Sequence, residues 1–190
     1  GSADIASVRR STLALAEDDG SWDPAATRCQ ASFDGGKLTL SGTKSFVVDG
    51  EAADLIVVSA WEDDDLSLYV VRGDADGLTR SSLNPFDRTR RLARLEMDRV
   101  LAERIVGATG TASVARALDL IIIALAAEQV GVAQAALDMA VGYAKERVQF
   151  GRVIGSFQAI KHMCADLLLD VESARSAAYY AAWAVADEHE

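Results

Sequence analysis

Cysteine and histidine are scarce in this sequence, with two of each among 190 residues. Cys29 and Cys164 are far apart and fit neither a CxxC motif nor the spacing of a metal site. The two histidines are equally isolated. These absences predict that the protein holds no metal ion and that its thiols stay reduced, which indicates a cytoplasmic location.

An excess of positive charge is also missing, because 29 acidic residues outnumber 19 basic ones and the formal net charge is −10. This charge argues against nucleic acid or an anionic membrane surface as the main partner. No apolar run predicts a membrane span. The sequence lacks an initiator Met, and its helical pattern continues to the last residues, so we expect it to be a piece of a longer protein.

The first half of the chain has the pattern of an antiparallel β domain. Residues 27–106 contain short alternating or β-branched runs, such as 37–41, 55–59, 66–71 and 92–98. Asp34-Gly35-Gly36 and Asp49-Gly50 are typical of hairpin turns. Several strands at this spacing, without helices between them, predict a closed barrel or a sandwich over residues 1–108.

The second half has the pattern of a helical bundle. An Ala- and Leu-rich helix is predicted from Thr111 to about Arg147, and its small residues, among them Gly131, would let another helix approach closely. After an interruption, apolar residues return at spacings of three and four, which indicates a second, antiparallel helix with a packed seam. The members of this seam are Phe157, Ile160, Cys164, Leu167, Val171, Ala174, Ala178, Ala181 and Val185. We therefore predict an α+β multidomain chain whose second domain, residues 109–190, holds the first long helices of a bundle.

The interruption between these helices, Tyr143 to Lys161, contains side chains that are suited to bind a ligand. Arg147 and Phe150 are three residues apart and would share one face of the last turn of the first helix. Gln158 falls in the first turn of the second helix, and Ser156 is placed to cap it. The corner is either structural, with Phe150 as a hydrophobic plug, or a binding site in which a cation, an aromatic ring and an amide converge.

The string from Tyr143 to Lys161 resembles the signature of acyl-CoA dehydrogenases, flavoenzymes that introduce a double bond next to an acyl-CoA thioester. That signature reads close to Y-A-x-x-R-x-x-F-G-x-x-I-x-x-x-Q, and the matching residues here are Tyr143, Ala144, Arg147, Phe150, Gly151, Ile154 and Gln158. The resemblance implies that the Arg reaches the pyrophosphate of FAD and that the Phe lies against the cofactor. It also implies that the Gln holds the adenosine side, commonly in a neighbouring subunit.

Two further segments resemble flavin motifs of the same family. The loop from Leu15 to Pro24 is similar to L-T-E-P-x-A-G-S-D, with Leu15, Glu17 and Asp23 in register; Ala16 replaces the threonine, Asp18 replaces the proline, and Gly20-Ser21 come one place early. The family's loop meets the flavin's pyrimidine edge. Because Ala16 has no hydroxyl, only main-chain contacts are expected to remain here.

The stretch from Ser41 to Gly50 is similar to G-x-K-x-W-I-T-N-G, with Gly42, Lys44 and Gly50 identical. Phe46 stands for the tryptophan that packs on the flavin and supplies an aromatic face. Val48 replaces the residue whose hydroxyl bonds the flavin N5 edge in the family. Because valine has no hydroxyl, a main-chain N–H would have to make that hydrogen bond.

A catalytic base is missing from the position where a minority of the family carries it. The segment resembling L-D-x-E-R is Leu118-Asp119-Leu120-Ile121-Ile122, in which Asp119 is retained as a substrate-binding candidate. Ile121 occupies the place of the glutamate base and Ile122 that of an arginine that assists CoA binding. No catalytic residue is therefore predicted in this segment.

The resemblance implies an FAD-dependent acyl-CoA dehydrogenase that acts as an oligomer, with a tetramer expected, and passes electrons to an electron-transferring flavoprotein or a similar acceptor. The predicted cofactor-binding residues are Leu15, Ala16, Gly20, Ser21, Phe46, Val47, Val48, Arg147, Phe150, Phe157 and Gln158. One alternative is a subunit of the same fold with an impaired site that serves in a hetero-oligomer. Another is an interaction module without cofactor. The sequence does not indicate the acyl chain length.

Overall fold

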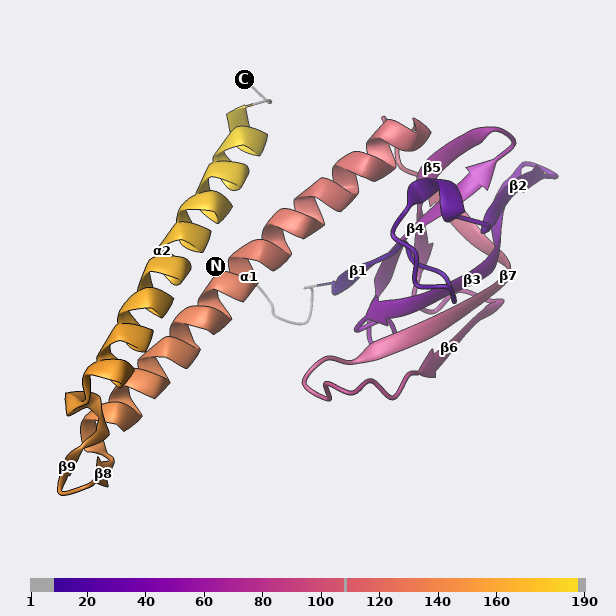
Figure 1. Cartoon of the computed structure of the whole chain (residues 1–190). Helices are drawn as coiled ribbons and strands as arrows, with labels where there is room; N and C mark the ends of the chain where they lie inside the picture. The colour runs from indigo at the N-terminus through magenta and orange to yellow at the C-terminus, as the bar shows by residue number, and fades with distance from the viewer. Residues whose placement is uncertain (1–8, 108, 188–190) are drawn as a thin grey trace, which may run out of the picture. The chain divides into compact units, whose positions relative to one another are not determined.

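A computed structural model describes residues 9–107 and 109–187. The chain divides into two compact units, Gly1–Arg116 and Ala117–Glu190. The ends of the predicted domains at residues 1–8, 108 and 188–190 lie outside the described residues. Figure 1 shows a β domain and two long helices, as the sequence predicts.

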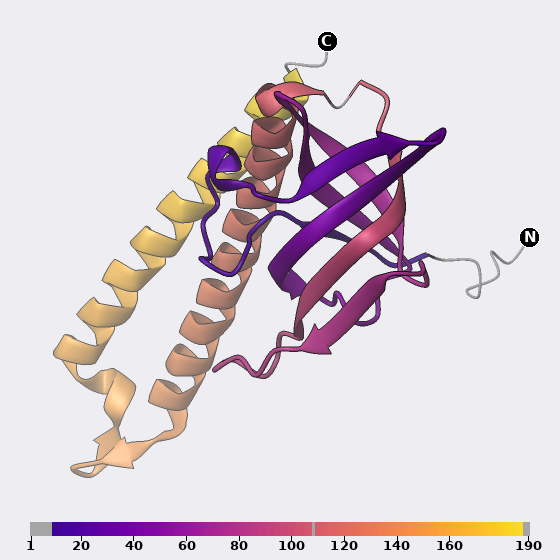
Figure 2. The ribbon, with the colours of Figure 1, turned by 90° about the vertical axis from the view of Figure 1, so that its right-hand side faces the viewer.

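The first unit is a closed β-barrel. Its strands are β1 (Ser11–Ala14), β2 (Gln30–Asp34), β3 (Lys37–Val48), β4 (Leu55–Glu62), β5 (Asp65–Arg72), β6 (Leu78–Ser82) and β7 (Leu92–Arg104), with a single 3₁₀ turn, η2 (Pro24–Ala26), between β1 and β2. Neighbouring strands follow the order β1-β4-β2-β3-β7-β5, and β5 pairs back to β4, which closes the ring (Figure 2). The sequence predicts an antiparallel barrel, but two of the strand pairs are parallel, because β4 runs parallel to both β1 and β2.

One predicted hairpin turn is confirmed and the other is wrong. Gly35 and Gly36 join β2 to β3, which pair directly with Asp34 opposite Lys37. Asp49-Gly50 joins β3 to β4, but β3 pairs with β2 and β7 instead. A turn residue sets the local direction of the chain, whereas the pairing partner is set by the pattern of the whole sheet.

The core of the barrel is built from alternate residues of its strands. Its large, fully buried side chains include Leu40, Ile56, Tyr69, Leu95 and Val100. Lys44 lies four residues after Leu40 on β3, so it shares the inward parity of the core residues, and its exposure is 0%. A charged side chain is thus buried in a largely apolar interior, together with a few serines such as Ser59.

The second unit contains most of helix α1 (Gly110–Glu146) and all of helix α2 (Gln158–Asp187). Between them lie a short hairpin, β8 (Val148–Gln149) and β9 (Arg152–Val153), and the 3₁₀ turn η3 (Ile154–Ser156). Phe150 and Gly151 form the two-residue loop of the hairpin, both with positive φ, 53° and 76°. The corner is therefore a hairpin, and Arg147 and Phe150 do not share a helical turn as predicted.

The prediction that Ser156 caps the second helix is also wrong. Its hydroxyl donates to the carbonyl of Val153 at 2.7 Å, inside the 3₁₀ turn. Phe157 is the residue that precedes α2, and its carbonyl accepts the first helical bond, from the Lys161 N–H at 3.1 Å. Gln158 begins α2, in agreement with the prediction. Gly155 lets the η3 turn lie close to the end of α1, because a Cβ on it would lie 2.8 Å from the carbonyl oxygen of Ala144.

The helices of the second unit have a narrow buried seam. On α1, the residues Val130, Leu137 and Ala144 are buried at seven-residue spacing, and Val171 is buried on α2. The Arg175 guanidinium donates to Gln134 Oε1 at 2.6 Å and ties α2 to α1. Leu167 and Ala174 of the predicted seam are exposed, and a Cβ on Gly131 would meet nothing within 4 Å.

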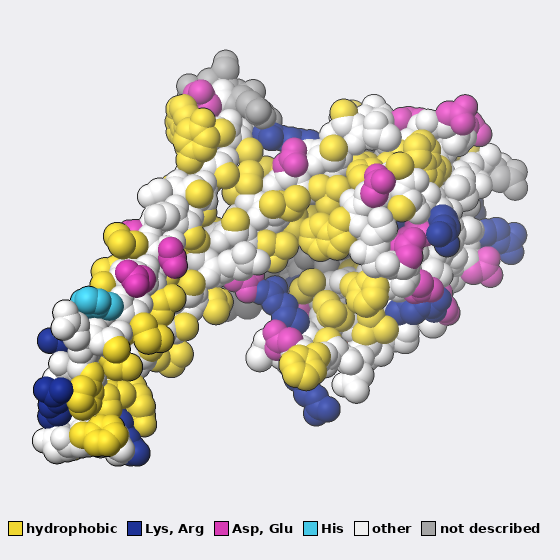
Figure 3. Space-filling view, in the orientation of Figure 1, with side chains coloured by type: hydrophobic (Ala, Val, Ile, Leu, Met, Phe, Trp, Pro, Cys, Tyr) yellow, Lys and Arg dark blue, Asp and Glu magenta, His cyan; other side chains and the backbone are white. Residues whose placement is uncertain are grey.

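Much of the apolar surface of these helices is exposed. Hydrophobic side chains gather along them in Figure 3, and the exposed ones include Leu120, Ile122, Val132, Met139, Tyr143, Met163, Leu168, Leu169, Tyr179, Tyr180 and Trp183. Contrary to the expectation from sequence, α1 is long and apolar enough to cross a membrane by length and composition alone. A core helix of a helical bundle satisfies the same criterion.

Gly42 offers a test of the barrel's packing, because its φ of 142° coincides with a tight approach to Cys29, the residue just before β2. A Cβ on Gly42 would lie 2.9 Å from Cys29 Cα. We expect Gly42→Ala to lower the free energy of unfolding by about 2–4 kcal/mol, from overpacking and backbone strain together. Urea denaturation measures this loss.

The matched control is Gly36→Ala, where φ is 80° but a Cβ meets nothing within 4 Å. It should show only the backbone strain, about 1–2 kcal/mol. Equal losses in the two variants would contradict the close approach.

Candidate functional site

The loop after β1, Leu15 to Pro24, is held against the barrel by Lys44; we call it the acidic loop. The Lys44 ammonium donates to Leu15 O at 3.0 Å, Glu17 Oε1 at 3.1 Å and Ser59 Oγ at 3.1 Å. Burial lowers the pKa of Lys44, while the Glu17 carboxylate beside it acts in the opposite direction. Three acceptors match the three protons of the ammonium, so the buried group is fully satisfied.

Glu17 joins the two ends of this loop. Its Oε1 accepts not only Lys44 but also the main-chain N–H groups of Arg28, at 2.8 Å, and Cys29, at 3.0 Å. Burial raises the pKa of the Cys29 thiol to about 11, so this side chain stays a neutral thiol at physiological pH. One carboxylate thus fixes the path of the chain from Glu17 to Cys29.

Asp18 faces a different set of partners. Its two carboxylate oxygens each accept a hydrogen bond from Arg94, both at 3.0 Å, and Oδ1 also accepts the Ser45 hydroxyl. Arg94 contacts Glu96 as well. The Arg94 and Ser45 hydrogen bonds lower the pKa of Asp18 from 3.8 to about 2. At neutral pH this carboxylate is therefore fully ionised, and it bridges β3 and β7.

Phe46 is turned outward by a β-bulge. Lys44 pairs with Leu95 and Val47 with Ala93, so Ser45 and Phe46 together oppose a single residue of β7, Arg94. Phe46 has φ of 58° and remains exposed. A bulge of this kind re-aims a side chain that regular pairing would place differently.

The acidic loop and the bulge form one surface. The Ser45 N–H donates to Ala16 O at 2.9 Å, and a Cβ on Gly20 would lie 3.7 Å from the Phe46 ring. Ser21 lies in the same loop, where its hydroxyl accepts the Asp23 N–H at 3.2 Å. Leu15, Ala16, Gly20 and Phe46, which the sequence predicts to share a site, are thus brought together.

Val47 and Val48 differ in orientation. The Val47 side chain is buried in the barrel core, and that of Val48 is exposed. The Val48 carbonyl accepts the Thr12 hydroxyl at 2.6 Å, which ties the end of β3 to β1. Only main-chain atoms of Val47, and not its side chain, are therefore available to a ligand.

The second group of predicted residues meets at the hairpin corner. The Arg152 guanidinium lies 4.1 Å above the centre of the Phe157 ring, and the Phe150 and Phe157 rings meet edge to face at 6.1 Å. Phe150 is 92% exposed. Arg147 is anchored through its main chain, whose carbonyl accepts the Ile154 N–H at 2.7 Å, and its side chain is exposed. Gln158 contacts His162 within α2 at 3.3 Å.

The segment that resembles L-D-x-E-R, Leu118 to Ile122, lies on α1. Asp119 and Ile122 are exposed, and Leu118 is buried. Ile121 is partly buried and carries no group that could exchange a proton. Within the described residues of this segment, Asp119 alone has an ionisable side chain.

Sequence reasoning missed the roles of Lys44, Asp18, Ser45 and Arg94 as supports, and of Arg152 at the corner. A signal was available for Lys44, because it shares the strand parity of Leu40 and must point into the barrel. For the pair of Asp18 and Arg94, 76 residues apart, no local pattern exists.

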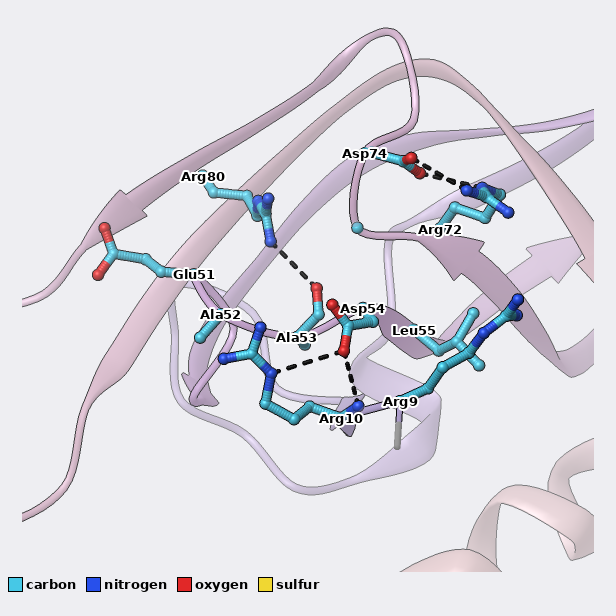
Figure 4. A pocket seen from close by; sticks show the side chains of 11 residues that line it. Arg9, Arg10, Glu51, Ala52, Ala53, Asp54, Leu55, Arg72, Asp74 and Arg80 are labelled. Carbon is cyan, nitrogen blue, oxygen red and sulfur yellow. Dashed lines mark hydrogen bonds and ion pairs between the residues drawn. The ribbon is translucent and has the colours of Figure 1, made fainter. Parts of the chain in front are cut away.

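A separate cavity of about 420 Å³ opens at another part of the barrel, and it contains none of the predicted site residues (Figure 4). It is lined by Arg9, Arg10, Glu51, Ala52, Ala53, Asp54, Leu55, Arg72, Gly73, Asp74 and Arg80. Its charges are largely paired, with Arg10 3.5 Å from Asp54 and Arg72 3.0 Å from Asp74. Arg80 donates to the carbonyl of Ala53 at 3.2 Å.

A closed barrel with an acidic loop against β3, followed by long helices that turn at an Arg–Phe–Gln corner, defines an acyl-CoA dehydrogenase-like fold. The family models "Acyl-CoA dehydrogenase, middle domain" and "Acyl-CoA dehydrogenase, C-terminal domain" match residues 12–100 and 108–190. The chain belongs to the acyl-CoA dehydrogenase family.

Known relatives agree with this assignment. The "Probable acyl-CoA dehydrogenase FadE25" of Mycobacterium tuberculosis is 34% identical over 90% of this chain and 47% of its own length. The solved "Tcur3481-Tcur3483 steroid ACAD G363A variant" has a TM-score of 0.83 at 39% identity, covering 94% of this chain and 48% of that one. The ChsE4-ChsE5 complex from Mycobacterium tuberculosis has a TM-score of 0.83 at 30% identity, with 94% and 48% covered. The chain thus spans about half the length of the relatives it matches.

The Lys44–Glu17 pair can be tested by removing the cation. Lys44→Met would leave the Glu17 carboxylate, 12% exposed, without its counter-charge, and we expect the free energy of unfolding to fall by about 3–5 kcal/mol. Chemical denaturation measures the change.

Lys37→Met removes the same charge from an exposed position on the same strand and should stay within about 0.5 kcal/mol of wild type. If the two variants are equally stable, the pair does not hold the loop.

Proposed function

We propose that this chain is part of an FAD-dependent acyl-CoA dehydrogenase that removes hydrogen from the α and β carbons of an acyl-CoA thioester. The observation that carries the proposal is the hairpin corner. There Phe150, which is 92% exposed, occupies the hairpin loop with a φ of 53°, and Arg147, three residues earlier, has an exposed side chain. Exposed aromatic rings on a rigid turn are suited to a flat ligand, and guanidinium groups are suited to phosphate.

Residue roles follow from the family resemblance and fit the exposure of each side chain. Arg147 would bind the pyrophosphate of FAD, Phe150 and Phe157 would lie against the cofactor, and Gln158 would hold its adenosine. The bound flavin would accept the hydride from the substrate β carbon.

On the barrel, Phe46 would supply an aromatic face to the flavin ring. Main-chain groups of Leu15, Ala16, Gly20 and Ser21 would meet its pyrimidine edge, and those of Val47 and Val48 its N5 edge. The exposed Asp119 would serve the substrate. The acceptor of the electrons would be an electron-transferring flavoprotein or a similar protein.

The proton on the substrate α carbon needs a base that Leu118–Ile122 does not contain. An isoleucine side chain at position 121 cannot accept a proton, and Asp119 is assigned to substrate binding. We therefore place the base outside this segment. A glutamate on the face of the thioester opposite the flavin would meet the requirement.

A second candidate function is favoured by Ala16 and Val48, the two positions at which flavin-directed hydroxyls are replaced. It is a subunit that completes the FAD site of a different partner chain while its own site is impaired. The solved relative ChsE4-ChsE5 is described as a complex of two proteins, which supports this candidate. The first candidate is a homo-oligomer that relies on main-chain contacts.

Purification of the full-length polypeptide alone separates the two candidates. Flavin content per protomer and oxidation of acyl-CoA with an artificial electron acceptor are measured. One FAD per chain with full turnover supports the homo-oligomer, whereas low flavin content that rises when a related partner chain is co-expressed supports the mixed oligomer. A colourless protein that binds no flavin in either preparation would refute both.

Arg147 gives a direct test of the corner. Arg147→Ala removes a charge-assisted contact to phosphate, which contributes about 1.5–3 kcal/mol, so the FAD affinity should fall by roughly 10- to 100-fold. Calorimetric titration of the full-length apoprotein measures the affinity.

Lys145→Ala is the matched control, since Lys145 is an exposed cation in the last turn of α1. It should change the affinity by less than about twofold, because exposed charges away from the ligand are screened by salt. Equal FAD affinity in wild type and Arg147→Ala would remove Arg147 from the site.

A further inference from the structure

The adjacent acids Glu17 and Asp18 tie the acidic loop to two different parts of the barrel. Glu17 binds the buried Lys44 in the interior. Asp18 binds Arg94 on β7 and the Ser45 hydroxyl on β3. The mechanism proposed above uses neither side chain for contact with the cofactor, so the Asp18 contacts need another explanation.

The position of Arg94 connects these contacts to the bulge. Arg94 is the residue of β7 that lies opposite Ser45 and Phe46, where β3 carries one residue more than its partner. Regular pairing is interrupted there, and a bulge needs other contacts to keep one conformation. The bidentate ion pair of Arg94 with Asp18, and the bond of Asp18 with Ser45, supply contacts at this point.

The same group of residues also fixes the acidic loop. The Ser45 N–H donates to Ala16 O at 2.9 Å, so Ser45 holds the loop by its main chain and Asp18 by its side chain. The Arg94 side chain is 30% exposed and that of Asp18 60% exposed. The bidentate geometry and the shared Ser45 distinguish this pair from a single exposed ion pair.

We propose that Asp18, Ser45 and Arg94 form a positioning clamp that sets the acidic loop and the Phe46 bulge for the isoalloxazine end of a flavin. This inference rests on the proposed function. The clamp residues do not touch the ligand; they fix the main chain of Ala16 and the direction of Phe46, which do. Preorganisation of this kind raises affinity by reducing the ordering required on binding.

The clamp acts on one end of the ligand, and this provides the test. Asp18→Asn and Arg94→Gln are made in the full-length protein, and binding of riboflavin and of ADP is measured at a temperature where every variant is folded. We expect each variant to lose roughly 3- to 10-fold in riboflavin affinity. ADP, which would engage the helical corner, should bind unchanged.

Two further variants complete the design. In the double variant, the losses in riboflavin affinity should not add, because removal of one partner already abolishes the pair. Asp63→Asn is the control, since Asp63 is an exposed acid in the turn between β4 and β5 and its φ of 52° is one that asparagine adopts readily. It should bind both ligands as wild type does.

The outcomes separate the clamp from the proposed function. Unchanged riboflavin binding in Asp18→Asn, additive losses in the double variant, or an equal loss of ADP binding would each overturn the clamp. If the wild type binds neither ligand, the proposed function fails, and the clamp is then decided by hydrogen exchange of the Ser45 amide, which donates to Ala16 O. Faster exchange of this amide in Asp18→Asn than in Asp63→Asn supports a clamp on the loop, and equal rates refute it.

Discussion

The structure of the barrel depends on the burial of one ammonium group. Lys44 has no exposed surface, and it would be costly in an apolar interior without the three oxygens of Leu15, Glu17 and Ser59. Two of these oxygens belong to the acidic loop, so the loop must close over the barrel for the lysine to be satisfied. Glu17 then orders the chain as far as Cys29 through two main-chain N–H groups. The conformation of a surface loop is thus set by an interior charge, and the surface formed with Phe46 follows from it.

The sequence predicts the architecture well where the signals are local. The alternating or β-branched runs over Leu55–Ser59 and Leu66–Val71 identify strands, and Asp34-Gly35-Gly36 identifies a hairpin, because strand and turn preferences act within a few residues. Asp49-Gly50 carries an equally good turn signal but joins strands that do not pair, since the sheet order is decided by contacts between distant segments. The corner shows the same limit: Phe150-Gly151 reads as the end of a helix, yet both residues have positive φ and form the loop of a hairpin.

The candidate site also contains residues that the sequence predicts and residues that it does not. Arg147, Phe150, Phe46 and the acidic loop are found from linear motifs, since each motif is a continuous string of the chain. Their supports are not found, because Asp18 and Arg94 meet only when β7 folds against β3. Lys44 lies between these cases, because it belongs to a linear motif, but its interior position follows only from the strand parity that it shares with Leu40. Assignment of the flavin-binding residues remains a prediction, and the geometry within each unit is consistent with it.

The narrow seam between α1 and α2 has a consequence for how a cofactor would be retained. Few side chains are buried between these helices, so most of their stability must come from whatever covers the rest of their apolar surface. The hairpin that presents Arg147 and Phe150 connects the ends of this helix pair. Under the proposed function, the retention of a cofactor at this corner would therefore depend on protein concentration if a second chain covers the helices.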